Sequence, residues 1–172
     1  MSALMSTAQI VGITTAACLS GMIASISYIG IPIIRLASPG VAVRQWSKAY
    51  ALGKAIAPPL AITSAACFGY MSYASRQALP LQSSELGSPM LLYAIAAALI
   101  PCIIPYTLSV MDPGANNRLK LLAKEAERSS KSMESIKDEA QELLGIWAGM
   151  NYVRAVAVGA GAVLGAIATI AM

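Results

Sequence analysis

Residues 147–165 read WAGMNYVRAVAVGAGAVLG, a stretch that joins a polar cluster directly to an apolar segment. Trp147, Asn151 and Arg154 follow one another at i, i+4 and i+7, so they share one face of a helix. Gly161 and Gly165 then form a small-xxx-small pattern among alanines, which lets helices approach closely. The stretch therefore predicts a membrane helix with one polar end and one tightly packed end.

The composition of the whole chain is typical of a polytopic membrane protein. Of its 172 residues, 57% are hydrophobic and 12% are charged, whereas a soluble domain has about 25% charged residues. Four apolar segments, at about 8–34, 55–74, 90–111 and 146–172, each reach the roughly 20 residues needed to cross a bilayer. We therefore expect a single all-α membrane domain over residues 1–172, folded as an integral membrane four-helix bundle.

The connection between the third and fourth segments, at about 115–145, predicts amphipathic helix on the cytosolic side. Apolar residues recur in it at helical spacing, with acidic and basic residues around them. We expect two helical pieces that break near Ser129 and Ser130, the second of which runs on into the fourth membrane helix. The Asp-Pro-Gly sequence at 112–114 predicts that the third membrane helix stops before this connection.

The distribution of basic residues predicts the orientation of the chain. Arg35, Arg44 and Lys48 fall in the connection between the first two segments, and six basic residues fall between the last two; the opposite side has only Arg76. The positive-inside rule then places both basic loops in the cytosol and both termini in the lumen or exterior. The lipid bilayer is thus an expected partner, while a mixed-sign charged segment without interleaved aromatics argues against nucleic acid. A homo-oligomer is left open.

Histidine is absent from the sequence, and the three cysteines are isolated. The absence of histidine excludes the commonest haem, zinc and non-haem iron ligand sets, and also a Ser-His-Asp or Cys-His nucleophile. Cys18, Cys67 and Cys102 each lie in an apolar run, where cysteine is typically a small packing residue. We therefore predict no metal site, and an enzyme built on this chain would use Lys, Tyr, Asp or Glu as acid and base.

All four segments bring polar or helix-breaking residues to the cytosolic level of the membrane. A buried arginine in a membrane helix costs at least about 2.5 to 3.5 kcal/mol and usually marks function, so we interpret Asn151 and Arg154 as part of a site. Aromatic and basic residues at this level also fit interface anchors. The other residues concerned are Tyr28, Pro32 and Arg35 in the first segment, Trp46, Tyr50 and Lys54 before the second, and Pro101, Pro105, Tyr106 and Thr107 in the third.

Two stretches of the chain resemble the anthrone oxygenase-like family of small four-helix membrane proteins. They are IPYTLSVMDPGANNRLKLL at 104–122 and LLGIWAGMNYVRAV at 143–156, and WSKAYALGKAIAPPLAI at 46–62 is similar as well. The residues that match the family pattern are Trp46, Tyr50, Pro58, Pro105, Tyr106, Thr107, Asn116, Leu119, Trp147, Asn151 and Arg154. The resemblance implies a fungal-type polyketide tailoring enzyme, placed in the endoplasmic reticulum, that oxidises an anthrone to an anthraquinone with O2 as co-substrate and without a metal or flavin cofactor.

For such a reaction the enzyme needs a base, groups that hold developing negative charge, and an apolar place for a flat aromatic polyketide. Arg154 and Asn151 suit oxyanion stabilisation. Trp46 or Trp147 suits ring stacking, and Tyr50, Thr107 and Asn116 are further candidates for substrate binding. Lys54, Tyr50 or Tyr106 could carry the proton.

Two other functions fit the same sequence. The first is a non-catalytic membrane scaffold or binding protein for an apolar metabolite. The second is a membrane cyclase or isomerase that uses the same pocket without O2. Quinone formation and oxygen consumption would separate them from an oxygenase.

Overall fold

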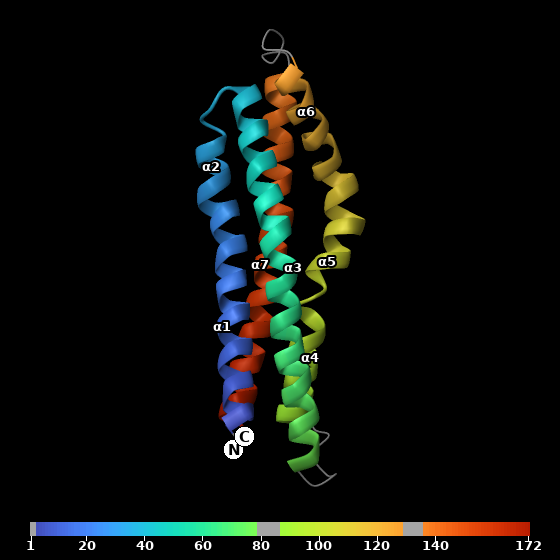
Figure 1. Ribbon diagram of the computed structural model, residues 1–172. Coiled ribbons are helices and arrows are strands. Elements are labelled where there is room, and N and C mark those ends of the chain that lie inside the picture. The colour runs from blue at the N-terminus through green and yellow to red at the C-terminus, as the bar shows by residue number, and fades with distance from the viewer. Residues whose placement is uncertain (1–2, 79–86, 129–135) are drawn as a thin grey trace. The chain divides into compact units, whose positions relative to one another are not determined.

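A computed structural model, which describes residues 3–78, 87–128 and 136–172, is all-helical over these residues (Figure 1). Four helical stretches are long and apolar enough to cross a membrane: Ala3–Ile34, Pro39–Gln77, Pro89–Arg128 and Lys137–Ile170. This confirms the predicted all-α class with four membrane-length helices. It also fits an integral membrane protein, because each stretch exceeds the length that spans the hydrocarbon.

The first stretch contains one widened turn. Helix α1 (Ala3–Ser25) passes into a π-helical turn, η1 (Ile26–Gly30), and then into α2 (Ile31–Ile34). Pro32 lies in the first turn of α2 and has no N–H to donate to the preceding turn. A π-turn there lets the helix continue past the proline, and such turns are frequent at functional sites.

The second stretch is a single helix, α3 (Pro39–Ala78), with Pro58 and Pro59 inside it. It begins well before the apolar segment expected at 55–74. The prediction that Arg44 and Lys48 lie in a loop was therefore wrong, because both residues are on the first turns of α3. Proline is favourable at the helix start because it lacks an N–H at a position where an N–H would have no helical partner. This explains why α3 begins at Pro39.

The third stretch changes geometry several times without ending at the expected place. Helix α4 (Pro89–Leu99) is followed by a turn, then α5 (Ile103–Tyr106), the π-helix η2 (Thr107–Asn116) and α6 (Asn117–Arg128). The predicted stop at 112–114 was wrong, since these residues lie inside η2. Pro113 has no N–H to donate, and in an α-helix its ring would clash with the carbonyl four residues back, whereas the wider π-helix gives the ring more room.

The fourth stretch is one helix, α7 (Lys137–Ile170). It confirms that the charged segment after the expected break runs on without interruption into the last membrane helix. Asp138 and Glu139 lie in its first turn, where acidic side chains favour a helix N-terminus. The break itself, predicted near Ser129 and Ser130, lies outside the described residues.

The chain divides into two compact units. Unit 1 comprises α1 as far as Gly21, α3 from Ala57, α4, and α7 from Ala155. Its packing is tight because glycines meet side chains directly. A Cβ added at Gly161 would lie 2.6 Å from Cγ1 of Ile100, and one at Gly165 would collide with the Phe68 ring. The predicted close approach at these glycines is confirmed.

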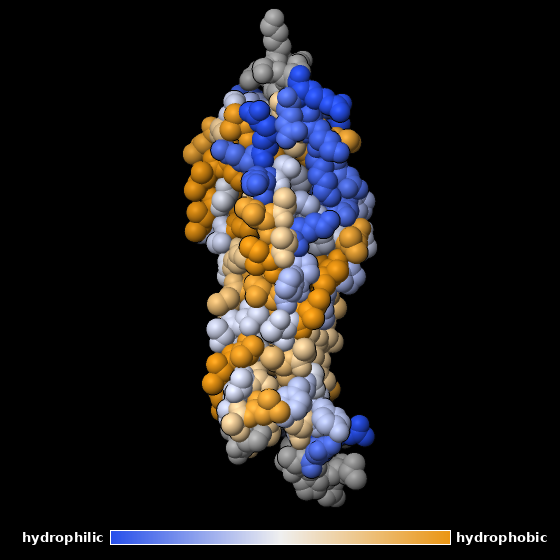
Figure 2. Space-filling view, in the orientation of Figure 1, coloured by the Kyte–Doolittle hydropathy of each residue, from blue (hydrophilic) through white to orange (hydrophobic). Residues whose placement is uncertain are grey.

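Unit 2 comprises the chain from Met22 to Ile56 and from Ile104 to Arg154. Its core contains two tryptophans, Trp46 and Trp147, among aliphatic side chains from α2, α3, η2, α6 and α7. The apolar face of α6 supplies Leu119 and Leu122 to this core, and its charged face is turned outward. Figure 2 shows hydrophilic residues gathered over α6, as an amphipathic helix requires.

Candidate active site in unit 2

An aromatic cluster forms one side of the candidate site. Trp46 and Tyr50, one turn apart on α3, stack with their ring centroids 5.3 Å apart and their planes 20° from parallel. Trp147 on α7 meets the edge of Trp46 at 5.9 Å. Trp46 has no exposed surface and Trp147 is only 3% exposed, whereas Tyr50 is half-buried. Tyr50 is therefore the partly exposed ring of this cluster, packed against the core that contains the two tryptophans.

The side chain of Asn151 connects α7 to α1 and η1 through hydrogen bonds to both its nitrogen and its oxygen. Its side-chain Nδ2 donates to the carbonyl of Ile23 at 3.0 Å and to Oγ of Ser27 at 2.9 Å. Its Oδ1 accepts a hydrogen bond from Nη1 of Arg154 at 3.0 Å. Ser27 lies in the π-turn η1, so the widened turn is where α1 receives this amide. Because Asn151 is buried and bonded on both sides, it fixes the direction in which Arg154 extends.

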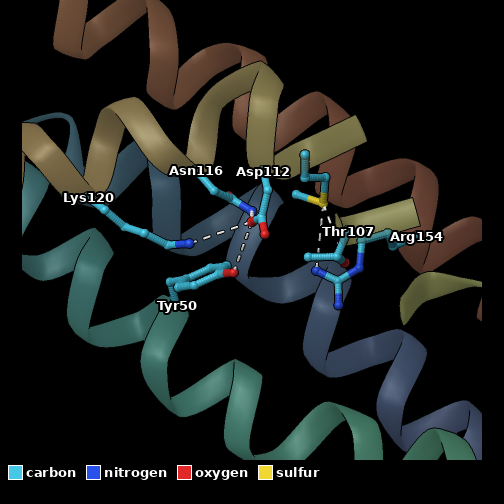
Figure 3. A network of polar contacts seen from close by, with 7 residues as sticks. Tyr50, Thr107, Asp112, Asn116, Lys120 and Arg154 are labelled. Carbon is cyan, nitrogen blue, oxygen red and sulfur yellow. Dashed lines mark hydrogen bonds and ion pairs between the residues drawn. The ribbon is translucent and has the colours of Figure 1, made fainter. Parts of the chain in front are cut away.

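Arg154 lies among neutral side chains. Its Nη1 also approaches Sδ of Met111 at 3.9 Å, and Figure 3 shows Thr107 beside the guanidinium group. No ion pair to Arg154 is found within residues 3–78, 87–128 and 136–172. An arginine held by an amide and a thioether keeps most of its capacity to bind an anion.

Asp112 is the centre of a second polar network (Figure 3). Three donors converge on one oxygen, Oδ1: the hydroxyl of Tyr50 at 3.4 Å, Nδ2 of Asn116 at 2.7 Å, and Nζ of Lys120 at 3.6 Å. Lys120 Nζ also lies 4.9 Å from the centroid of the Tyr50 ring, within cation–π range. Asp112, Asn116 and Lys120 therefore form one row along η2 and α6, facing Tyr50 on α3.

Four buried side-chain atoms have no hydrogen-bond partner among the described residues, and all four belong to unit 2. They are Nε1 of Trp46, Nε1 of Trp147, Nε of Arg154 and Oδ1 of Asn116. Leaving such an atom unpaired costs about 1 to 3 kcal/mol, and native proteins contain few. Three donors and one acceptor without partners in one unit therefore make unit 2 the part of the described chain where buried polar groups are least satisfied.

The structure brings together most of the residues that the sequence predicted for a site. Trp46, Tyr50 and Trp147 are in contact, and Asn151 bonds Arg154. Tyr106 packs against the unit 2 core and is half-buried. Asn116 contacts Asp112, and Thr107 contacts Met111 across one helical turn, with their Oγ1 and Sδ atoms 4.0 Å apart.

Lys54 is the predicted site residue that takes part in neither network, although its charge acts on Tyr50, one turn away on α3. It is exposed, and no hydrogen bond or ion pair joins it to either network in the described part of the chain. The reason is geometric, because each residue turns a helix by about 100° and eight residues therefore leave Lys54 about 80° away from Trp46. Arg35, expected at the same membrane level, binds Gln141 instead, with its Nε donating to Oε1 at 2.6 Å.

Sequence reasoning missed Asp112, Lys120 and Ser27. A signal existed for the first two, since Asp112 and Asn116, and likewise Asn116 and Lys120, are four residues apart, the spacing of neighbours on a helix surface. Interpreting Pro113 and Gly114 as a helix stop concealed that row. Ser27 gave no signal, because an isolated serine in an apolar helix is common.

Comparison with other proteins finds one matching family and several curated relatives. The sequence profile of the family described as anthrone oxygenase matches residues 46–164, which is more than half of the chain. The chain is 29% identical to an anthrone oxygenase of Aspergillus fumigatus over 94% of its own length and 92% of the relative's. It is 30% identical to an anthrone oxygenase of Claviceps purpurea, covering 91% and 85% of the two chains.

A noranthrone monooxygenase of Aspergillus flavus is 27% identical over 91% of this chain and 70% of the relative. No solved structure gives a significant match. The matched residues 46–164 contain Trp46, Tyr50, Asp112, Asn116, Lys120, Trp147, Asn151 and Arg154, which are the side chains of the two polar networks and the aromatic cluster. The family match thus covers the candidate site almost entirely.

Proposed function

This chain belongs to the anthrone oxygenase family, and we propose that it is a membrane-bound oxygenase that converts an anthrone to the corresponding anthraquinone with O2. The structural observation that supports this reaction is the set of four unpaired buried atoms in unit 2. Three donors and one acceptor match an aromatic ligand that carries a carbonyl and phenolic hydroxyls. One of the donors is Nε of Arg154 itself, the cation that such a reaction needs.

The reaction requires no reductant. An anthrone has a methylene group between two aryl rings, opposite its ketone, and loss of one methylene proton gives an electron-rich anthrolate. The anthrolate passes one electron to O2, and the two radicals combine at the methylene carbon. Loss of water then leaves one oxygen atom of O2 as the new ketone oxygen, while the other departs with both methylene hydrogens. Substrate oxidation and O2 reduction therefore balance within one turnover.

Arg154 and Asn151 are assigned to the oxyanion. Negative charge develops first on the substrate ketone oxygen and then on the reduced oxygen, and a fixed guanidinium in a low-dielectric site stabilises such charge best. Asn151 holds Nη1 of Arg154, so its role is to position the cation. The unpaired Nε of Arg154 is a further donor toward substrate.

The aromatic cluster is assigned to substrate binding. Trp46 is already stacked on Tyr50 and fully covered, so it contributes its indole N–H and the support of Tyr50 more than a free face. Trp147 contributes the second unpaired indole N–H, and Asn116 the unpaired carbonyl oxygen. Thr107 and Tyr106, at the junction of α5 and η2, complete the proposed binding residues.

The membrane location that we propose follows from the chemistry of the substrate. A flat aromatic polyketide partitions into lipid, and a membrane protein can take it from the bilayer; we place the chain in the endoplasmic reticulum with its basic connections cytosolic. We also propose that no metal or flavin takes part. Within the described residues, no three His, Cys, Asp or Glu side chains form a group that could hold a metal ion.

The test is oxidation of emodin anthrone under air by the protein purified in detergent. We expect quinone formation faster than in buffer, one O2 consumed per quinone, and one ¹⁸O atom in the product when ¹⁸O2 is supplied. A chelator should leave the rate unchanged. No acceleration over buffer would contradict the oxygenase, leaving a binding protein, and conversion of substrate without O2 uptake would instead indicate a cyclase or isomerase.

A further inference from the structure

We infer that Asp112 is the general base that removes the methylene proton of the substrate. This inference rests on the proposed function, because it assigns a residue to the first step of that reaction. The bases that the sequence suggested, Lys54, Tyr50 and Tyr106, are not carboxylates. Asp112 was not among them because the sequence predicted that the third membrane helix stops at residues 112–114.

The hydrogen bonds of Asp112 leave one oxygen for chemistry. Tyr50, Asn116 and Lys120 all contact Oδ1, whereas Oδ2 accepts no hydrogen bond from any residue within the described ranges. One oxygen is thus anchored from three directions while the other is available. A carboxylate held in this way is a competent base toward a carbon acid next to a conjugated carbonyl.

Asp112 belongs to the same unit as Arg154, the cation assigned to stabilise the negative charge that develops on the substrate oxygen. Asp112 follows Met111 directly in η2, and Sδ of Met111 contacts Nη1 of Arg154 at 3.9 Å. Figure 3 shows the Asp112 carboxylate and the Arg154 guanidinium in the same region of unit 2. A base and an oxyanion donor on neighbouring segments of one unit can act on opposite parts of one flat substrate.

The neighbours of Asp112 argue against the other candidate bases. Tyr50 donates its proton toward Asp112, so it supports the carboxylate and does not compete with it. Lys120 lies close enough to balance the charge of Asp112 and is itself held over the Tyr50 ring. Lys54 is exposed. The base therefore keeps its negative charge in the resting enzyme without a second carboxylate nearby in the described network.

The proton transfers balance with Asp112 as the only carrier. A methylene C–H bond breaks, an O–H bond forms on Oδ2, and the electron pair stays on the substrate carbon, delocalised to the ketone oxygen. After O2 has added, Asp112 returns this proton to the peroxide oxygen. It then removes the second methylene proton as the O–O bond breaks, and protonates the departing hydroxide to give water.

The test separates proton removal from oxidation by excluding O2. Under nitrogen in D2O, the wild-type protein should accelerate exchange of the methylene hydrogens of emodin anthrone, followed by NMR. Asp112→Asn, which keeps the side-chain shape, should lower both exchange and aerobic quinone formation by about a hundredfold or more. Asp138→Asn, the same substitution at an exposed position on α7, should leave both rates unchanged.

Asp112→Glu keeps a carboxylate and should recover part of both rates, which a purely structural role would not predict, since the longer side chain disturbs the contacts of Oδ1. If Asp112→Asn exchanges the methylene hydrogens at the wild-type rate, the assignment of the base is overturned. Quinone formation by the wild-type protein would still support the oxygenase in that case. Wild-type oxidation without accelerated exchange would also overturn the assignment of the base. A wild-type protein with neither activity would contradict the proposed function itself.

Discussion

Asn151 and Arg154 form a hydrogen-bonded pair in which both polar atoms of the amide have partners, whereas the guanidinium keeps a donor without one. Oδ1 of Asn151 accepts from Nη1 of Arg154 at 3.0 Å, and both contacts of its Nδ2 go to α1 and η1, to Ile23 and Ser27. Arg154 keeps an unpaired Nε. The amide therefore behaves as a positioning group, and the guanidinium as the group available to a ligand.

Replacing Arg154 should lower the rate of quinone formation more than the rate of proton removal. In Arg154→Met the side-chain volume is largely kept but the cation is lost, and we expect quinone formation to fall by about a hundredfold to a thousandfold, as for loss of an oxyanion donor. Anaerobic exchange should fall less, because Asp112 is intact. Arg44→Met, at an exposed position on α3, is the matched control; equal losses in both variants would contradict the role of Arg154.

Replacing Asn151 should lower both stability and activity. Asn151→Ala leaves Ser27 and the Ile23 carbonyl without their buried partner, and each unpaired group costs about 1 to 3 kcal/mol. We expect a lower thermal midpoint in detergent, and a turnover number reduced about tenfold or more in the folded fraction, since Arg154 is no longer fixed. An unchanged turnover number would show that Arg154 needs no support from Asn151.

Removing the hydroxyl of Tyr50 tests the anchoring of Asp112. Tyr50→Phe keeps the stack on Trp46 and loses only the 3.4 Å contact to Oδ1, a long hydrogen bond whose contribution is modest. We expect a several-fold loss of anaerobic exchange with unchanged stability. A loss as large as that of Asp112→Asn would instead make Tyr50 the base.

The tight packing of unit 1 can be tested with a pair of glycines. Gly165→Ala places a methyl group against the Phe68 ring, whereas an added Cβ at Gly69 meets no atom within 4 Å. We expect Gly165→Ala to destabilise the protein by about 1 to 3 kcal/mol, and Gly69→Ala to leave stability unchanged or raise it, because alanine favours helix. Thermal unfolding in detergent measures both, and equal midpoints would contradict the close packing at Gly165.

The orientation in the membrane follows from the charges and can be measured directly. We expect a glycosylation acceptor site added at either terminus to be modified, because the positive-inside rule places both termini in the lumen. The same acceptor inserted between α6 and α7 should stay unmodified. Modification at that connection alone would reverse the proposed orientation.

The helical class and the main cluster could be predicted from the sequence because both rest on periodicity. Arg154 lies seven residues after Trp147, which returns it to within about 20° of the same helix face, and the structure places both in unit 2. Close packing at Gly161 and Gly165 follows from residue size alone. These features require no knowledge of which other segment is the neighbour.

The remaining features depend on backbone geometry that local rules do not anticipate. Pro113 and Gly114 usually end a helix, yet here a π-helix accommodates them, and the row of Asp112, Asn116 and Lys120 exists only because the helix continues. Lys54 lies outside both networks among the described residues, because the regular helix α3 carries it about 80° around the axis from Trp46. The hydroxyl that accepts a hydrogen bond from Asn151, that of Ser27, lies in the π-turn η1, which the sequence did not predict.

The ion pair between Lys120 and Asp112 has a consequence for the charge of the site. Because these two charges cancel, Arg154 leaves the polar networks of unit 2 with one net positive charge. The neutral anthrone does not complement that charge, and neither does the neutral quinone. The anionic intermediate does. When it forms, Asp112 holds the proton taken from the substrate, so Lys120 and Arg154 both face the anion while the total charge of protein and substrate is unchanged. The site is therefore electrostatically matched to the intermediate and releases both neutral partners to the lipid.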